Sequence, residues 1–163
     1  MTMIIDGTNG LTFNNATTQA SAGVVLQVVN ATTSTTVTST TSTFVDTTLT
    51  ATITPKFSNS KILVAVHQNG LVRFSGNVAA DMKLKLVRNS TDITVLSLYS
   101  FYTGTSLEIR GQTLSTSYLD SPATTSATTY KTQFAAAENA GTVAVQNESG
   151  NSVSTITLME IAQ

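Results

Sequence analysis

Residues 32–55, TTSTTVTSTTSTFVDTTLTATITP, decide the fold class of this sequence. A stretch so rich in Thr and Ser would form a flexible linker in a Pro-rich context, but here Pro appears only at the end, as Pro55. Thr is β-branched and fits a pleated, half-buried surface. In the last part of the stretch, threonines alternate with the apolar residues Leu49, Ala51 and Ile53. This period of two predicts a strand that ends before Pro55, and we expect a further strand within residues 36–45.

Short apolar or alternating segments, separated by Gly, Asn and Ser, continue to the end of the chain. Residues 61–68 are apolar on both faces, as in a strand covered on both sides, and Asn69-Gly70 predicts a turn after them. Further strands are expected at residues 24–30, 82–86, 93–101, 106–114, 128–134, 142–146 and 152–161, and a turn at 89–92 joins two of them into a hairpin. Only residues 134–140, FAAAENA, favour a helix, and we expect at most a single turn there.

Eight or nine short strands at about ten-residue spacing are typical of an all-β sandwich or barrel. We therefore expect residues 24–163 to form an antiparallel β-sandwich. A jelly roll is the first choice, and another Greek-key sandwich is the alternative.

Residues 1–23 differ from the rest of the sequence. Two turn dipeptides, Asp6-Gly7 and Asn9-Gly10, lie between short apolar patches, which predicts a small hairpin or an extended N-terminal arm. The segment is too short to form a core, so its apolar side chains are expected to dock on another surface. The residues expected to make this attachment are Ile4, Ile5, Leu11 and Phe13.

The composition excludes several classes of protein. A chain of 163 residues suffices for one domain, and the absence of Cys rules out disulfides and thiolate metal sites. Eight Lys and Arg residues against nine Asp and Glu residues, with no block of like charge, argue against nucleic-acid binding. No apolar run approaches the ~20 residues of a membrane span, and the N-terminus does not resemble a signal peptide. Because charged residues form only 10% of the chain, hydroxyl groups are expected on a neutral surface suited to contacts between copies.

No catalytic constellation is recognisable, and no cofactor is expected. His67 is the only His and there is no Cys, so a nucleophile would lack a base. We expect His67 to be hydrogen-bonded in the core or at an interface, although a trimer could gather three copies of it on its axis as metal ligands. Glu108 and Asp120 are the carboxylates that could be argued for a glycosidase, but the acids are scattered through turns and form no pattern.

Four aromatic residues could stack on a sugar: Phe101, Tyr102, Tyr118 and Tyr130. Aromatic residues in strands more commonly pack in a core or in contacts between subunits. We expect that second use here.

Residues 4–22, IIDGTNGLTFNNATTQASA, resemble the N-terminal segment of short fibre-like structural proteins of tailed bacteriophages, particularly those that infect cyanobacteria and other marine bacteria. In these proteins a DG-x-x-G-[IL]-x-F-x-[DN]-x-T-x-Q pattern recurs. Residues 44–70, FVDTTLTATITPKFSNSKILVAVHQNG, and residues 154–162, STITLMEIA, look like the sandwich domains that follow this segment.

The resemblance implies a sandwich protomer that forms a homotrimer on the virion. It implies either a short tail fibre that contacts the host surface, with a host glycan as a candidate partner, or a head fibre or capsid decoration protein. The N-terminal arm would then bind other virion proteins. The sequence departs from long host-binding fibres because no shaft repeats lie between the arm and the sandwich.

Overall fold

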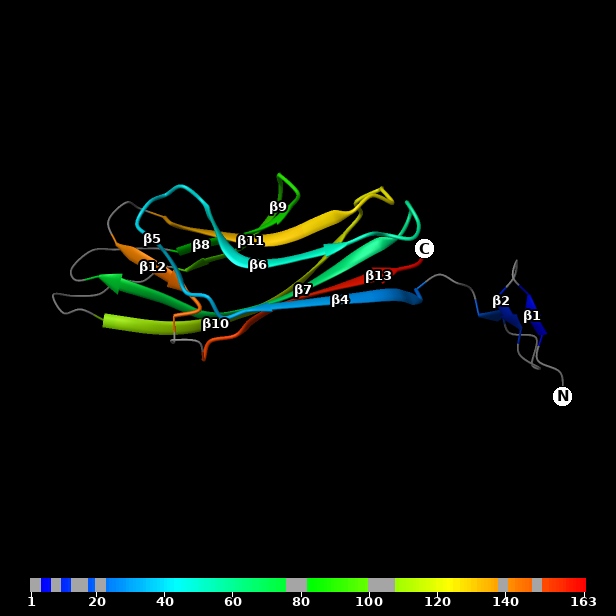
Figure 1. Ribbon diagram of the computed structural model, residues 1–163, viewed down its shortest axis with the longest axis horizontal. Helices are drawn as coiled ribbons and strands as arrows, with labels where there is room; N and C mark the ends of the chain where they lie inside the picture. The colour runs from blue at the N-terminus through cyan, green and yellow to red at the C-terminus, as the bar shows by residue number, and fades with distance from the viewer. Residues whose placement is uncertain are drawn as a thin grey trace.

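Two antiparallel β-sheets face each other in the computed structural model, and the chain passes repeatedly from one sheet to the other (Figure 1). The structure describes residues 4–6, 10–12, 18–19, 23–75, 82–99, 108–137, 141–147 and 151–163. These residues contain no helix, and therefore no helix long and apolar enough to cross a membrane. The expected all-β class is confirmed.

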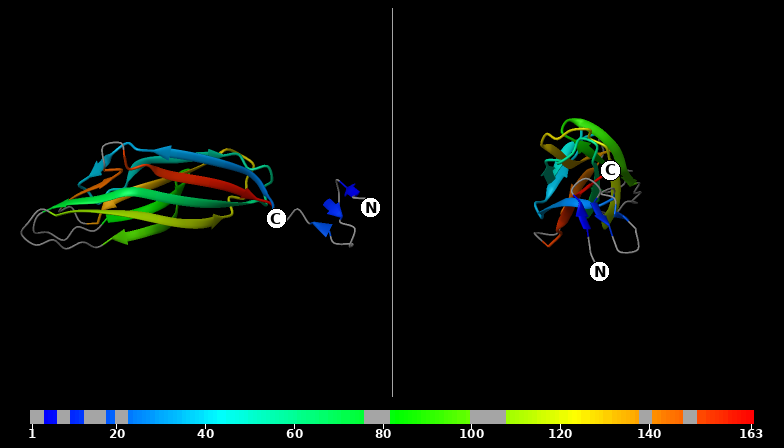
Figure 2. Two further views of the ribbon diagram at one scale, coloured as in Figure 1. Left: turned by 90° about the horizontal axis from the view of Figure 1, so that it is seen from below. Right: turned by 90° about the vertical axis from the view of Figure 1, so that its right-hand side faces the viewer.

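Each sheet contains four principal strands. The first sheet is formed, in spatial order, by β4 (Val25–Thr33), β13 (Ser154–Ile161), β7 (Lys61–Ser75) and β10 (Glu108–Asp120), which lie side by side in Figure 2. The second is formed by β6 (Val45–Ile53), β11 (Thr128–Ala136), β8 (Met82–Arg88) and β9 (Thr91–Tyr99). Two shorter strands, β5 (Val37–Ser39) and β12 (Thr142–Val145), pair with each other, and β12 joins them to the first sheet by pairing with β7.

Four antiparallel ladders are nested around the two-residue turn at Asn89 and Ser90. The innermost joins β8 to β9, the next β7 to β10, the third β6 to β11 and the outermost β4 to β13. The chain is thus one long hairpin rolled over two sheets, and the ladders β7–β13 and β8–β11 complete each sheet. This is the strand order of a jelly roll, so the expected sandwich and its first-choice topology are confirmed.

Alternating side chains fill the space between the sheets with two apolar clusters. One contains Leu49, Ile53, Ile62, Val64, Val66, Leu86, Tyr130, Ile156 and Leu158, and the other Leu71, Met82, Leu84, Phe134, Val143 and Val145. Tyr130 and Phe134 are fully buried on one face of β11, as their spacing predicts. The threonines that alternate with the buried residues of β6 are exposed, so they occupy the solvent face as expected.

Buried polar side chains separate the two clusters. The Oγ1 atoms of Thr47 and Thr132 are 2.5 Å apart, and Thr132 donates to Oε1 of Gln68 at 2.9 Å. Gln68 then donates from Nε2 to Oγ of Ser154 at 3.0 Å. None of these four side chains has exposed surface, and each of the first three stands on its strand between residues of the two clusters. We call this row of hydrogen bonds the polar chain, and it links the two sheets through the core.

The polar chain continues to Gln146, just after β12. Ser154 accepts hydrogen bonds from Gln68 and from the backbone N–H of Asn69 at 2.9 Å. Its own proton then needs an acceptor, which the side-chain oxygen of Gln146 provides at 3.1 Å when that amide is oriented with its nitrogen toward the carbonyl of Val145. Each side chain of the polar chain then has hydrogen-bond partners, as buried polar groups require.

β7 continues through Asn69-Gly70, so the turn predicted there is wrong. β10 borders β7 along its whole length, whereas on the other side β13 pairs with its first half and β12 with its second half. Gly70 has φ of +59°, and a Cβ at this position would lie 2.6 Å from the backbone nitrogen of Asn147. Gly is therefore required for close approach of the chain, and the Asn-Gly pair marks a change of partner strand.

Some predicted boundaries also differ. Within residues 36–45 the strand is only β5, and residues 40–44 connect it to β6. The helical turn predicted at 134–140 is wrong for residues 134–136, which end β11, while residues 138–140 lie outside the described residues. The expected hairpin is confirmed, although β9 begins at Thr91.

The N-terminal residues form a small sheet of their own, consisting of β1 (Ile4–Asp6), β2 (Gly10–Thr12) and β3 (Thr18–Gln19). β1 and β2 pair with Ile5 opposite Leu11, the hairpin that the two turn dipeptides predict. At the start of the sandwich, the backbone of Gly23 donates to Ala162 at 2.7 Å, and Ala162 donates back to Val24 at 2.9 Å. The chain thus enters the sandwich beside its C-terminus (Figure 1).

We predict that Thr132→Val lowers the free energy of unfolding by about 1–3 kcal/mol, because it leaves the buried side-chain oxygen of Gln68 without its donor. The Thr47 hydroxyl loses one hydrogen bond but keeps those to the carbonyl of residue 132 and the N–H of Leu49. Thr129→Val, on the same strand, is the matched control. The Thr129 hydroxyl binds Thr52 at the surface, so its loss should change stability by about 0.5 kcal/mol or less. Urea unfolding measures both, and equal losses would contradict a special role for the polar chain.

Glu160 holds the loop between β6 and β7 against the end of β13. Its carboxylate accepts hydrogen bonds from the backbone N–H groups of Lys56 at 2.7 Å and Phe57 at 3.3 Å, and from Nε2 of Gln27 at 2.5 Å. Burial raises the pKa of Glu160, but these hydrogen bonds outweigh burial and hold the pKa below its ordinary value.

Because its folded pKa is lowered, Glu160 stabilises the fold above its unfolded pKa, and this contribution is lost as the pH falls through the acid range. Glu160→Gln should therefore cost about 2 kcal/mol at pH 7, and the difference from wild type should narrow toward pH 3. Asp92→Asn, at an exposed acid that pairs with Lys85, is the control, and its difference from wild type should stay below about 1 kcal/mol throughout. Thermal unfolding between pH 3 and 7 tests this, and a difference that stayed constant would exclude Glu160 as a source of acid sensitivity.

Candidate functional site

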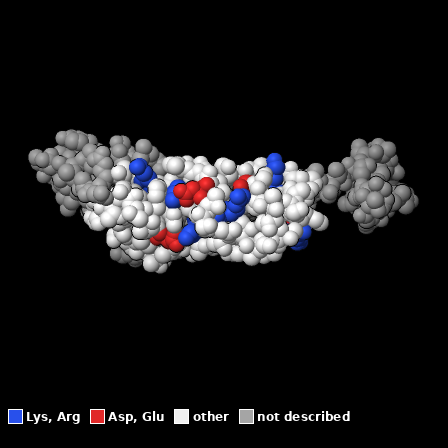
Figure 3. All heavy atoms as spheres, turned by 90° about the horizontal axis from the view of Figure 1, so that it is seen from above, with Lys and Arg blue, Asp and Glu red and all other residues white. Residues whose placement is uncertain are grey.

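The outer face of the second sheet, which we call the polar face, carries acidic and basic side chains (Figure 3). The exposed threonines of β6 add hydroxyl groups to it. Lys85 pairs with Asp92 at 2.8 Å, and Lys131 pairs with Asp46 at 2.9 Å. Nζ of Lys85 also lies 4.1 Å from the centre of the Phe44 ring, close enough for a cation–π contact. The charges on this face are thus largely neutralised by one another.

A bulge in β6 shapes this face. Residues 47–49 of β6 face only Thr132 on β11, so the ladder contains two extra residues on one strand. The flanking side chains of the bulge point into the core, and Thr48 points outward with φ of +69°. A positive φ is strained for a β-branched residue, and both bulges and such strain recur beside functional sites.

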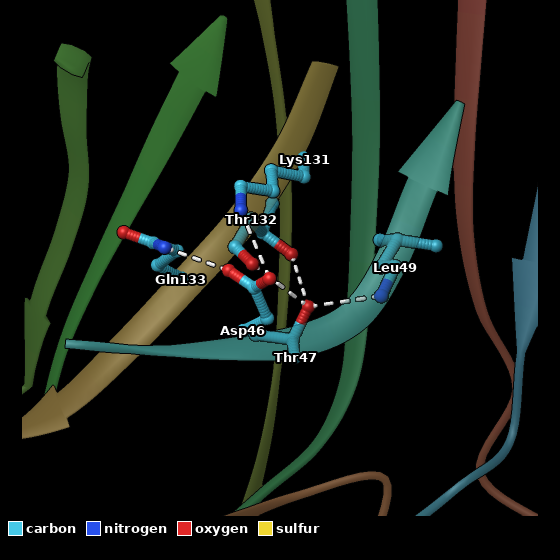
Figure 4. Close-up of polar contacts among 6 residues, drawn as sticks. All are labelled: Asp46, Thr47, Leu49, Lys131, Thr132 and Gln133. Carbon is cyan, nitrogen blue, oxygen red and sulfur yellow. Dashed lines mark hydrogen bonds and ion pairs between the residues drawn. The ribbon is translucent and has the colours of Figure 1, made fainter. Parts of the chain in front are cut away.

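A hollow of about 400 Å³ lies beside the bulge, lined by residues 46 and 48–50 of β6, Thr129 and Lys131 of β11, and Asn89 of the β8–β9 turn. Figure 4 shows Lys131 and Gln133 directed at Asp46, with Nε2 of Gln133 at 2.6 Å from the carboxylate. Partial burial raises the pKa of Asp46, but the hydrogen bonds from Lys131 and Gln133 and the charge of Lys131 outweigh it and hold the pKa below its ordinary value.

The hollow offers hydrogen-bonding groups without excess charge. The ionised carboxylate of Asp46 is balanced by the ammonium of Lys131, and Thr hydroxyls and the Asn89 amide add neutral donors and acceptors. This lining suits a neutral polyhydroxylated molecule better than an ion. The residues that line the hollow include no nucleophile paired with a base.

Sequence reasoning did not single out Asp46, Lys131 or Gln133. The available signal was an acid and a base at outward positions of two Thr-rich strands. That signal becomes informative only once these strands, far apart in the sequence, are known to be neighbours.

The outer face of the first sheet, which we call the apolar face, has different chemistry. Val28, Met159, Leu63 and Leu119 lie opposite one another across its four strands. Val28 is 57% exposed and Leu119 48% exposed, and Leu63 is half-buried. Residues 61–68 were expected to be covered on both sides. Within one chain only their inward side chains are buried, and their outward side chains are partly or fully exposed.

His67 also lies on the apolar face, where it is exposed and its Nδ1 is 2.7 Å from Oγ of Ser115. The expected hydrogen bond is confirmed, whereas a core position is wrong, and an interface position stays a prediction. Within one chain, the described residues contain no group of three His, Cys, Asp or Glu side chains that could hold a metal ion.

Glu108 and Asp120 lie at opposite ends of β10. The strand between them rises about 40 Å, whereas a glycosidase holds its two carboxyl groups within about 10 Å of each other. Asp120 accepts hydrogen bonds from Arg88 at 2.7 Å and from the hydroxyl of Tyr130 at 2.6 Å. Burial and the hydrogen bond to Asp120 raise the pKa of Tyr130. Because β10 holds Glu108 and Asp120 so far apart, the two acids of one chain do not form a catalytic pair.

The structure places the other candidate residues only in part. Ile4 and Ile5 belong to β1 and Leu11 to β2, whereas Phe13 lies outside the described residues. Of the aromatic candidates for sugar stacking, Tyr130 is buried in the core and Tyr118 is 37% exposed, while residues 101–102 are not described. The attachment role of the arm residues stays a prediction.

Comparisons with known proteins give only distant likenesses. No family model and no curated protein matches the chain. Among solved structures, one of infectious bursal disease virus, Gx strain, has 12% identity and a TM-score of 0.42 over 90% of this chain and 40% of that chain. The VP2 subviral particle of the same virus has 14% identity and a TM-score of 0.31 over 84% of this chain and 38% of that chain. These values are too low to assign a function.

We predict that Thr48→Asn raises the free energy of unfolding by about 0.5–1 kcal/mol, because Asn adopts a positive φ at lower cost than a β-branched residue. Thr50→Asn is the matched control at an outward, extended position of the same strand, where Asn has the lower strand propensity and should not stabilise. Chemical unfolding of the two variants measures the difference. If Thr48→Asn destabilised the protein as much as Thr50→Asn, the bulge would not be strained.

Proposed function

We propose that this protein is a virion structural protein of a tailed bacteriophage, a short homotrimeric tail fibre that contacts the host surface. The observation that carries the proposal is the separation of the small N-terminal sheet from the sandwich. Strands β1–β3 pair with one another, and the chain then enters the sandwich at Gly23 and Val24, beside the C-terminus. An arm at one end of an elongated body is the arrangement expected of an appendage that is attached by one end and projects by the other (Figure 1).

The two outer faces of the sandwich support different contacts in this proposal. The apolar face provides surface for copies of the same chain, and the polar face remains free. The hollow beside Asp46 and Lys131 then provides hydrogen-bonding groups for a neutral host glycan. A weak site on each subunit gives useful avidity when three subunits act together.

The alternative is a head fibre or capsid decoration protein, which has the same arm and sandwich. The sandwich of residues 24–163 follows the arm of residues 1–23 directly, with no shaft repeats. This favours the alternative, because the body would reach only a short distance from its anchor. Immunolabelling of intact particles with an antibody to residues 24–163 distinguishes the two. Label on the tail supports the fibre, label on the head supports decoration, and a protein absent from particles would refute both.

We predict that a chain starting at Val24 folds normally but fails to join virions, because it lacks the arm. In the full chain, Phe13→Asp should weaken attachment without lowering the melting temperature, since burial of one Phe contributes about 1.5–3 kcal/mol to docking. Val95→Asp, at a 65% exposed position of the sandwich, is the control and should attach normally. Occupancy on purified particles is the measurement, and normal occupancy of the shortened chain would show that the arm is not the anchor.

A further inference from the structure

The apolar face presents four rows of outward side chains. The row of Val28, Met159, Leu63 and Leu119 crosses the whole sheet. On one side of it lie Val25, Ile161 and Lys61, and on the other side lie a row of Asn30, Thr157, Ala65 and Ser117 and a row of Thr32, Thr155, His67 and Ser115. No carboxylate occurs in these rows, and the cationic side chain of Lys61 stands at their border.

The edge strand of this sheet is apolar on both sides near its end. Leu119 belongs to the apolar face, and its neighbour Tyr118 points to the opposite side, yet both are exposed, at 48% and 37%. Within the described residues, β10 pairs only with β7, so its other edge is free. An edge strand with exposed large apolar side chains is ordinarily covered by a partner.

The charge distribution favours a second copy of this chain as that partner. Two ion pairs of the described sandwich, Lys85–Asp92 and Lys131–Asp46, lie on the polar face. A third, between Arg88 and Asp120, lies at the end of β10 and is likewise neutral overall. The apolar face is almost uncharged, so two copies can bring it together without like-charge repulsion. A nucleic acid or an anionic membrane would instead require several cations on this face.

The size of the face favours a ring over a face-to-face dimer. Four strands about 4.8 Å apart and seven residues long cover about 450 Å². A face-to-face dimer would bury about 900 Å² in total, below the ~1,200–2,000 Å² of stable interfaces. In a closed ring each subunit contributes two surfaces, its face to one neighbour and its edge to the other, so the ring buries more surface per subunit.

We infer that the apolar face is the subunit interface, with the β10 edge of one copy, at Tyr118 and Leu119, resting on Val28, Met159 and Leu63 of the next. This inference rests on the proposed trimer and names the surface that forms it. Contacts of this kind are heterologous, and three of them close a ring. The polar face, with its hollow, is then directed away from the ring axis.

Light scattering of the full chain at micromolar concentration tests the interface. Wild type should have three times the 17.1 kDa mass of one chain. Val28→Lys and Leu119→Lys should each reduce the trimer fraction at least about tenfold, because each buries a charge in the contact. Val95→Lys, which replaces an exposed apolar residue on the other sheet, is the matched control and should remain trimeric. Circular dichroism of all three variants checks that the fold is retained.

Cross-linking tests the geometry, since the chain has no Cys of its own. Val28 and Leu119 are three strand spacings apart within one chain, about 14 Å, which is too far for a disulfide. The double variant Val28→Cys/Leu119→Cys should form covalent trimers on oxidation, whereas each single variant should stay uncross-linked. Single variants that form dimers would point to a face-to-face contact and overturn the ring.

The outcomes separate this inference from the proposed function. A monomeric wild type would refute the trimer and the interface together. A trimeric wild type whose Val28→Lys and Leu119→Lys variants behave like Val95→Lys would leave the trimeric fibre intact and refute the apolar face as its interface.

Discussion

The buried hydrogen bond between Thr132 and Gln68 fixes the level at which both sheets change their pairing. On the side of the second sheet, residues 47–49 bulge opposite Thr132. On the side of the first sheet, the strand that contains Gln68 exchanges β13 for β12 as its partner. A hydrogen bond between the sheets holds both irregularities in register, because a shift of either strand would leave a buried polar group unpaired. The apolar core divides into two clusters at the same level.

The outer surfaces follow from this interior. The inward turn of Thr47 at the bulge forces Thr48 outward with a positive φ, and the hollow of the polar face opens next to it. In the first sheet, β13 and β10 flank β7 in regular ladders between Ile62 and His67, and the one irregularity of the β4–β13 ladder lies at the border of this region, at Glu160 and Ile161. That regularity gives a smooth face on which apolar side chains line up across four strands. One face is thus hollowed and polar, whereas the other is smooth and apolar.

Local pattern predicted the parts of the fold that depend on alternation alone. A period of two predicts the buried face of β6 and the position of Tyr130 and Phe134 on one face of β11. Turn residues predict the β8–β9 hairpin. Asn69-Gly70 was misread because the same dipeptide serves both a turn and a close approach, and only the neighbouring Asn147 distinguishes them. The apolar strand around His67 predicts a position in the core or at an interface, and the alternation of the strand puts its side chain on the outer face. The contact of Asp46 with Lys131 joins strands that are distant in sequence, so no local pattern reveals it.

Because only 10% of the residues are charged, contacts made by the outer surface of the sandwich depend little on the salt concentration. Exposed ion pairs weaken as salt rises, since the screening length falls from about 10 Å at 0.1 M to about 3 Å at 1 M. Burial of apolar side chains such as Val28 and Leu119 does not weaken in this way, and hydrogen bonds to hydroxyl groups are likewise little affected by screening. On the polar face Lys85 is paired with Asp92 and Lys131 with Asp46, so little of their charge is left to attract unrelated ions or proteins. Contacts made by such a surface are expected to persist in dilute buffer and in concentrated salt, as the proposed virion role requires.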